Sequence, residues 1–148
     1  MRKQIVHATL LIFVFVVLSG CALGRKEWPT SVKSEDTFSL KLMDGVRQDG
    51  CLMLQIAVTG SPNRLWRASV QYEAVGTEEG QGCEGCPFVP RNAVHFTRDQ
   101  KGFDLTGNTL RLSICGLEPG IDYRFRVAGK SELSTMAIEY TDVFEALP

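Results

Sequence analysis

Apolar and polar residues alternate one by one along much of the chain after residue 36, and no convincing helical spacing interrupts them. Side chains of a strand point alternately to opposite faces, so a half-buried strand repeats every two residues, whereas a helix repeats every 3.6. The alternation recurs in six segments, the last less regular: 37–43, 51–58, 66–74, 108–117, 123–129 and 136–144. The pattern predicts antiparallel strands, with Trp66 and Ala68 among the inward residues of the third.

Turn-forming residues separate these segments. The turn sequences are Asp49-Gly50, Ser61-Pro62-Asn63, Gly107-Asn108 and Glu118-Pro119-Gly120. Glycine supplies backbone conformations with positive φ, proline presets φ, and asparagine and aspartate bond their own backbone, so such clusters end strands. Six or seven strands in about 110 residues predict an all-β fold, a single antiparallel β-sandwich over residues 36–148.

The N-terminus has a different pattern. Arg2 and Lys3 precede an apolar stretch from Ile5 to Val17, which small residues follow. A bilayer span needs about 20 apolar residues, so this stretch is too short to cross comfortably. A positive start, a short apolar core and small residues at its end indicate an export signal helix.

Leu18-Ser19-Gly20-Cys21, at the exit from that stretch, resembles the lipobox of bacterial lipoproteins. The resemblance implies cleavage before Cys21 and a diacylglycerol on its sulfur, with residues 1–20 as signal peptide and 21–35 as a flexible lipidated tether. It also implies anchoring in the bacterial cell envelope. Ala22 goes with outer-membrane sorting in enteric lipoproteins, which implies a periplasm-facing location. The alternative is an ordinary signal or anchor helix with an incidental cysteine.

Charge excludes one class of partner. The whole chain has a formal net charge of −1, and loss of Arg2 and Lys3 with the signal leaves it two units more negative. A mildly acidic domain lacks the basic footprint that nucleic acids require. We therefore expect no nucleic-acid partner.

Residues 116–129, GLEPGIDYRFRVAG, resemble the corner between strands E and F of fibronectin type III domains. The family pattern falls on Leu117, Pro119, Gly120 and Tyr123. The resemblance implies a fibronectin type III or immunoglobulin-like sandwich with a tyrosine corner, in which the Tyr123 ring packs inside while its hydroxyl bonds upstream backbone. The region from 75 to 109 is longer than usual in this family.

With Cys21 lipidated, four cysteines remain, and an even number in an exported chain suggests disulfides. Alternation places Cys51 and Cys115 on the outer face of their strands. In the family that the chain resembles, strands B and E are antiparallel neighbours, so the start of one lies opposite the end of the other. The resemblance therefore implies a Cys51–Cys115 disulfide.

Cys83 and Cys86 form a C-x-x-C motif in a glycine-rich segment. A local disulfide that pins a long loop is the first interpretation. A redox pair needs a cysteine at a helix N-terminus, and nothing helical follows here. A zinc site needs four ligands, and His95 would supply only a third. We expect a structural disulfide and no metal or cofactor, with a thiol-disulfide redox or metal-binding protein centred on this motif as the alternative.

One outer strand face is rich in arginine. Alternation places Arg67, Arg124 and Arg126 outward, and the family pairing sets Arg67 near Arg126. Such a face is a possible binding surface for an anionic partner, while the alternative is arginine stems that cover the sheet with their charges in water. No triad, G-x-S-x-G elbow or carboxylate pair indicates catalysis. We expect a non-enzymatic envelope binding or assembly module with a membrane anchor and an envelope protein or glycan as partner.

Overall fold

The structure is a computed structural model, which describes residues 36–146. Nine strands form in this part of the chain, and a 3-10 turn, Pro62–Arg64, precedes the third. The strands are β1 (Phe38–Gln48), β2 (Cys51–Gly60), β3 (Leu65–Val75), β4 (Asn92–Thr97), β5 (Asp104–Thr106), β6 (Thr109–Cys115), β7 (Asp122–Ser131), β8 (Glu139–Tyr140) and β9 (Phe144–Ala146). The predicted signal peptide, the lipidated Cys21 and the tether lie outside the described residues.

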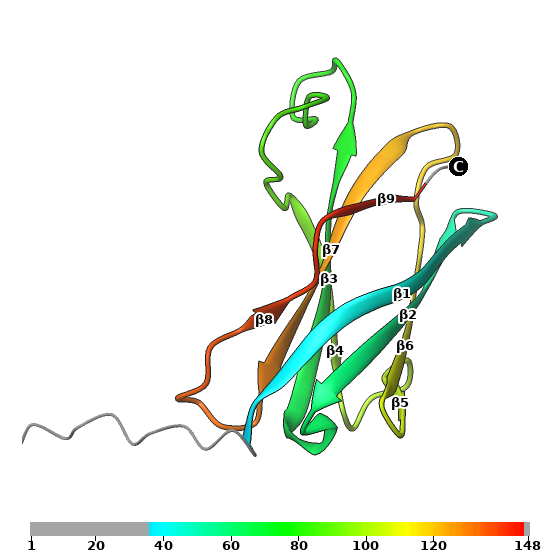
Figure 1. Ribbon diagram of the computed structural model, residues 1–148. Helices are drawn as coiled ribbons and strands as arrows, with labels where there is room; N and C mark the ends of the chain where they lie inside the picture. Colours follow the sequence, from blue (N-terminus) through cyan, green and yellow to red (C-terminus); the bar gives the residue numbers. More distant parts are fainter. Residues whose placement is uncertain (1–35, 147–148) are drawn as a thin grey trace, which may run out of the picture. The chain divides into compact units, whose positions relative to one another are not determined.

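The strands form two antiparallel sheets that face one another (Figure 1). One sheet has the order β1-β2-β6-β5, which is the A-B-E-D order of immunoglobulin-like sandwiches. The other has the order β4-β3-β7-β8, and β9 also pairs with β7. The predicted all-β antiparallel sandwich is confirmed. Among the described residues, no helix is long and apolar enough to span a bilayer.

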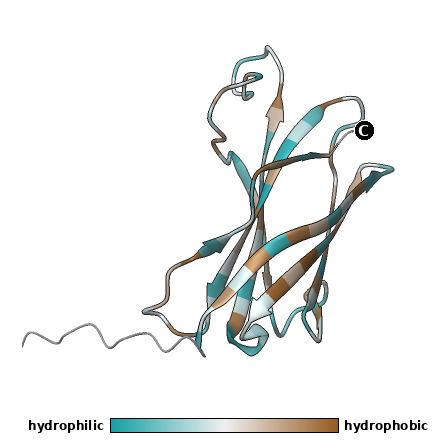
Figure 2. Ribbon diagram, in the orientation of Figure 1, coloured by the Kyte–Doolittle hydropathy of each residue, from teal (hydrophilic) through white to brown (hydrophobic). Residues whose placement is uncertain are grey.

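Most of the core consists of inward residues that the alternation predicted, and Leu65 and Phe103 join it without having been predicted. Figure 2 shows hydrophobic and hydrophilic residues alternating along the strands. Leu52, Leu54 and Ile56 of β2 are buried, and Val70 and Phe125 of the other sheet are also buried in the same core. Burial of each such side chain contributes about 1.5–3 kcal/mol before entropy costs, so this interface holds the sheets together.

Trp66 does not enter the core, and its predicted inward position is wrong. A β-bulge between Leu65 and Arg67 shifts the register, so Leu65 is fully buried while Trp66 is 41% exposed. A bulge adds one residue to a strand and therefore reverses the faces before it. Gly129 belongs to the same crowded end, because a Cβ there would lie 2.7 Å from Leu40 Cδ1 and 3.0 Å from Leu65 Cδ1.

The long region between residues 75 and 109 contains β4, β5 and the β3–β4 loop, residues 76–91 (Figure 1). The loop begins with a parallel bridge between Val75 and Gly82. The Gly82 N–H donates to Ala74 O at 2.8 Å, and the Gly76 N–H donates to Gly82 O at 2.9 Å. These bonds turn the chain back on itself, so the loop starts as a defined structure.

Candidate functional site

The outer face of the β4-β3-β7-β8 sheet is a grid of side chains set by strand register. In its central row, Ser69 of β3 lies between His95 of β4 and Ala128 of β7, and Ala128 in turn pairs with Tyr140 of β8. Ser69 and Ala128 are small, whereas the residues of β3 and β7 in the rows on either side are long: Arg67, Lys130, Gln71 and Arg126. The register therefore leaves a depression along the central row.

This depression is a hollow of about 210 Å³, which we call the central hollow. Its lining residues are Arg67, Ser69, Gln71, His95, Ala128, Lys130, Ile138 and Tyr140. Ser69 Oγ lies 2.7 Å from His95 Nδ1, so the floor carries a hydrogen-bonded polar pair. Tyr140 and Ile138 are each 45% exposed and supply an apolar wall.

Two cations stand along one side of the central hollow. Arg67 pairs with Lys130 across β3 and β7, not with Arg126, so the predicted Arg67–Arg126 neighbourhood is wrong. The register of β3 on β7, which is continuous from Arg67 to Val75, sets this row four residues along β7 from Arg126. Within residues 36–146, neither Arg67 nor Lys130 forms an ion pair. Like charges directly opposite one another destabilise a strand pair, so this row is electrostatically uncompensated.

Asp99, which follows the end of β4 by two residues, is fully exposed. The Thr97 side chain bonds the Asp99 carboxylate and holds the pKa of that carboxyl below its usual value, and a backbone hydrogen bond acts in the same direction. Thr97 pairs with Arg67 across β3 and β4. Hydrogen bonds within residues 97–99 thus explain the lower pKa of Asp99.

Arg126 lies on the other side of the central hollow and is held in place. Its Nε and Nη2 atoms both donate to Gln71 Oε1, at 3.1 and 2.7 Å. Its guanidinium carbon lies 4.2 Å from the Tyr140 ring centroid and 5.2 Å from that of Phe88. Stacking of this kind orients a guanidinium and its aromatic partners together. Arg126 therefore fixes two residues that line the hollow, Gln71 and Tyr140.

Arg124 is not part of an exposed face, and that prediction is wrong. The residue is buried and pairs with the fully buried Glu73, with 2.5 Å between Nη2 and Glu73 Oε1. Its Nη1 donates to Cys86 O at 2.6 Å. The side chain does point outward, as alternation predicted, but the β3–β4 loop covers it. Glu73 was missed from the sequence, because the expected register set Arg67 beside Arg126, whereas the actual register pairs Glu73 with Arg124.

Cys83 and Cys86 form a disulfide within the β3–β4 loop. This agrees with the first interpretation of the C-x-x-C motif, a local disulfide that pins a long loop. The loop is fastened to the sheet at Cys86 by Arg124 and at Val89, whose N–H donates to Glu73 Oε1 at 3.3 Å. A Cβ on Gly82 would lie 2.8 Å from the Glu73 carboxylate, so the chain approaches the pair closely there. No cluster of three metal-ligating side chains occurs among residues 36–146.

Cys51 and Cys115 are register partners on β2 and β6, and a disulfide joins them as the resemblance implied. Their Cα atoms are 4.0 Å apart. Both residues lie at the end of the sandwich where the β1–β2 hairpin meets the β6–β7 corner. There the Leu117 N–H donates to Gly50 O at 2.9 Å. The covalent link and this bond fasten the same two turns.

The tyrosine corner lies beside this link. Tyr123 is buried, and its hydroxyl accepts a hydrogen bond from the Glu118 N–H at 3.3 Å, which is the arrangement that the resemblance implied. Leu117 is buried, and Gly120 adopts a φ of 77° in the turn after Pro119.

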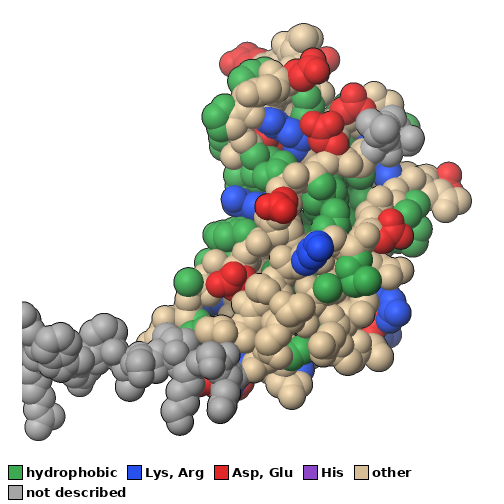
Figure 3. Space-filling model, in the orientation of Figure 1, with side chains coloured by type: hydrophobic (Ala, Val, Ile, Leu, Met, Phe, Trp, Pro, Cys, Tyr) green, Lys and Arg blue, Asp and Glu red, His purple; other side chains and the backbone are tan. Residues whose placement is uncertain are grey.

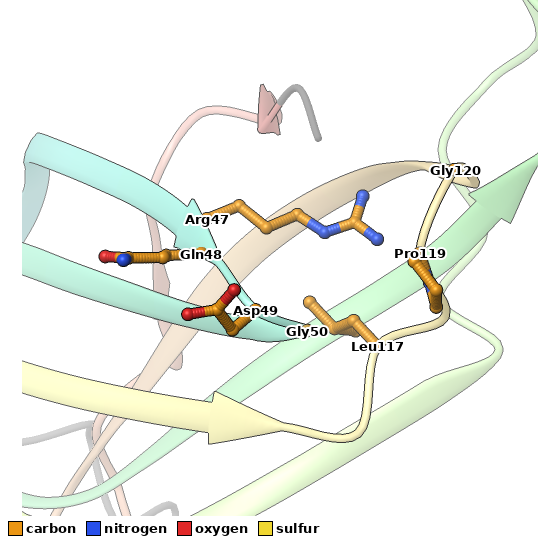
Figure 4. A pocket seen from close by; sticks show the side chains of 7 residues that line it. All are labelled: Arg47, Gln48, Asp49, Gly50, Leu117, Pro119 and Gly120. Carbon is orange, nitrogen blue, oxygen red and sulfur yellow. The ribbon is translucent and has the colours of Figure 1, made fainter.

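Arg47, which sequence analysis missed, crosses from β1 to this corner (Figure 4). It donates to Ile121 O at 2.5 Å and to Glu118 O, and its guanidinium carbon lies 5.1 Å from the Tyr123 ring centroid. The pocket beside it measures about 450 Å³, and Figure 4 shows its lining residues. Because both ends of the guanidinium are already bonded, this larger pocket is a scaffold feature and the central hollow is the better candidate site.

No protein-family model matches the sequence, and no curated protein matches it. Among solved structures, the chain is similar to part of the chitinase ChiW from Paenibacillus sp. str. FPU-7, a bacterial cell-surface-expressed multi-modular enzyme. The identity is 15% and the TM-score is 0.46, and the match covers 86% of this chain and 10% of that one. The chain thus spans about a tenth of ChiW, and a likeness at this level assigns it no function.

Proposed function

We propose that this chain is a non-enzymatic binding module of the bacterial cell envelope, anchored in the membrane by a lipid on Cys21, and that it binds an anionic partner at the central hollow. The observation that carries the binding site is the pairing of Arg67 with Lys130 beside a concave polar floor. Small-molecule sites are concave and hold a few polar groups that fix the orientation of the ligand.

The energetics of that row support binding. Two like charges opposite one another cost stability in the free protein, and a ligand anion between them would replace repulsion by two charge-assisted hydrogen bonds. The outer face of the other sheet differs, since its Arg111 is already paired with Asp104 at 3.5 Å. The basic side chains of residues 36–146 are therefore not equivalent, and the β4-β3-β7-β8 sheet carries two of them, Arg67 and Lys130, without an ion pair beside a hollow.

The envelope location is supported by the export signal, the lipobox resemblance and the two disulfides. Disulfides form and persist in oxidising compartments such as the bacterial periplasm. The two sheets share one buried core, so the strands that carry this face are held in place without a ligand. A rigid face on a lipid tether suits a module that holds a partner near a membrane.

The anchor is tested by fractionating cells that express the full chain. We expect wild type in the membrane pellet and the Cys21→Ser variant in the soluble fraction, since that variant has no thiol to lipidate. Wild type that is soluble, or a variant that remains in the pellet, would contradict the anchor.

The binding face is tested with a photocrosslinking residue at Thr97, on the rim of the hollow, or at Lys41 on the outer face of the other sheet. We expect envelope adducts from position 97 that disappear in an Arg67→Gln, Lys130→Gln background. Equal adducts from both positions would overturn the assignment of the binding face.

A further inference from the structure

We propose that the central hollow takes one uronic acid unit, a sugar that bears a carboxylate, within an acidic polysaccharide. The inference rests on the proposed function, because it names the anionic partner of the same site. Three properties of the hollow point to this ligand: the paired cations, the mixture of donors and acceptors beside them, and the apolar wall opposite His95.

The cations suit a carboxylate. A guanidinium presents parallel N–H groups that match the two oxygens of a carboxylate, and an ammonium adds a point charge. Arg67 and Lys130 are register partners on adjacent strands, so both reach the same end of the hollow. Neither side chain has an ionic partner of its own in the part of the chain that the structure describes.

The floor suits hydroxyl groups. Sugar hydroxyls both donate and accept, and the hollow offers both functions: Ser69 Oγ and the His95 ring exchange one hydrogen bond and retain further bonding positions. Gln71 gives its oxygen to Arg126, which leaves its amide N–H groups as donors toward the hollow. A simple anion such as the carboxylate of an acidic peptide needs donors only, so this mixture favours a polyol.

The wall suits the apolar face of a sugar ring. Tyr140 closes the central row at β8, and Ile138 lies beside it. Arg126 stacks on Tyr140 at 4.2 Å, which limits the movement of that ring before any ligand arrives. Preorganised side chains reduce the entropy lost on binding.

The size of the hollow limits the ligand to one unit. Pockets for drug-sized ligands measure about 300–1,000 Å³, and the central hollow is smaller at about 210 Å³. A single sugar ring within a longer polysaccharide therefore fits the volume of the hollow better than a compact, drug-sized ligand does. Affinity for one unit is expected to be weak, and a polymer with many acidic units would gain through multivalency.

The test measures binding to the full-length chain, purified in detergent, by NMR titration. The probes are trigalacturonate, the neutral trisaccharide maltotriose and hexaglutamate. We expect trigalacturonate to shift the amides of Ser69, Ala128 and Lys130, and maltotriose to bind at least about tenfold more weakly, since it lacks the charge-assisted bonds.

Three variants locate the site. Lys130→Gln removes one cation, and Ala128→Leu fills the floor without changing charge; each is expected to weaken trigalacturonate binding at least about tenfold. Lys41→Gln removes the same charge from the other sheet and is expected to leave affinity unchanged. Thermal unfolding of each variant checks that the sandwich is intact.

Each outcome decides between the two proposals. Stronger binding of hexaglutamate at these amides overturns the uronic acid assignment and leaves an anion-binding module in place. Equal binding of maltotriose shows that no charge is recognised and overturns both. No binding of any probe overturns the uronic acid assignment, while the crosslinks from Thr97 still test the module independently.

Discussion

At the scale of single residues, the Glu73–Arg124 pair shows that a side chain can point away from the core and still be buried. Glu73 Oε1 accepts from Arg124 Nη2 and from the Val89 N–H, and both side chains are buried. Removing one partner of a buried ion pair leaves the other charge desolvated and unpaired. We therefore expect Glu73→Gln to lower the free energy of unfolding by about 3–5 kcal/mol, measured by urea denaturation.

Glu145 is the matched control for this substitution. It is the register partner of Arg124 on β9, but it is exposed. Glu145→Gln is expected to change the free energy of unfolding by about 0.5 kcal/mol or less. If both variants lose the same stability, the buried pair does not fasten the loop to the sheet.

Alternation in the sequence predicted which way these side chains point, and the structure agrees for Arg124, Arg126 and Arg67. It did not predict what covers them, because period two describes only the two faces of a strand. Whether a loop returns over a face depends on contacts between distant residues, here Arg124 with Cys86. The predicted inward position of Trp66 was wrong for a related reason. A β-bulge arises from the way two strands pair, and the alternation within a single strand does not reveal it.

At the scale of elements, the β3–β4 loop is held by more than its disulfide. The Cys83–Cys86 link spans a sequence separation of 3, and a chain-entropy estimate for so short a loop is about 2 kcal/mol. The contacts of Arg124, Glu73 and Gly82 remain when the disulfide is removed. We expect a Cys83→Ser, Cys86→Ser variant to lose about 2 kcal/mol or less in urea denaturation and to keep the sandwich.

The same variant has a local signature. Amide hydrogen exchange should rise within residues 76–91 and stay unchanged in β2 and β6, since the loop opens without the sheets. Faster exchange throughout both sheets would show instead that the disulfide supports the whole fold. Sequence analysis predicted this disulfide, but only the structure shows what it fastens: a loop that brings Phe88 onto Arg126 beside the central hollow.

At the scale of the whole molecule, the net charge does not describe the local arrangement of charges. Figure 3 shows basic and acidic side chains interspersed on the face it presents. A net charge of −1 therefore says little about where an anion could bind. The arrangement of sheets was predictable, because the strand periods and the E–F corner both specify a sandwich. The central hollow was not, because it needs the register of four strands at once.

The Cys51–Cys115 link acts on the whole fold, since it joins β2 to β6 across a sequence separation of 64. Closing so long a loop in the unfolded chain restricts it far more than closing the C-x-x-C turn, and the chain-entropy estimate is about 4 kcal/mol. We expect Cys51→Ser, Cys115→Ser to lower the free energy of unfolding by about this amount, roughly twice the effect of the loop variant, in the same urea experiment. The Leu117–Gly50 bond and the Arg47 contacts hold the same turns together without the link, so the variant should still fold. Equal losses from the two disulfide variants would mean that local contacts, and not restriction of the unfolded chain, decide what each link contributes.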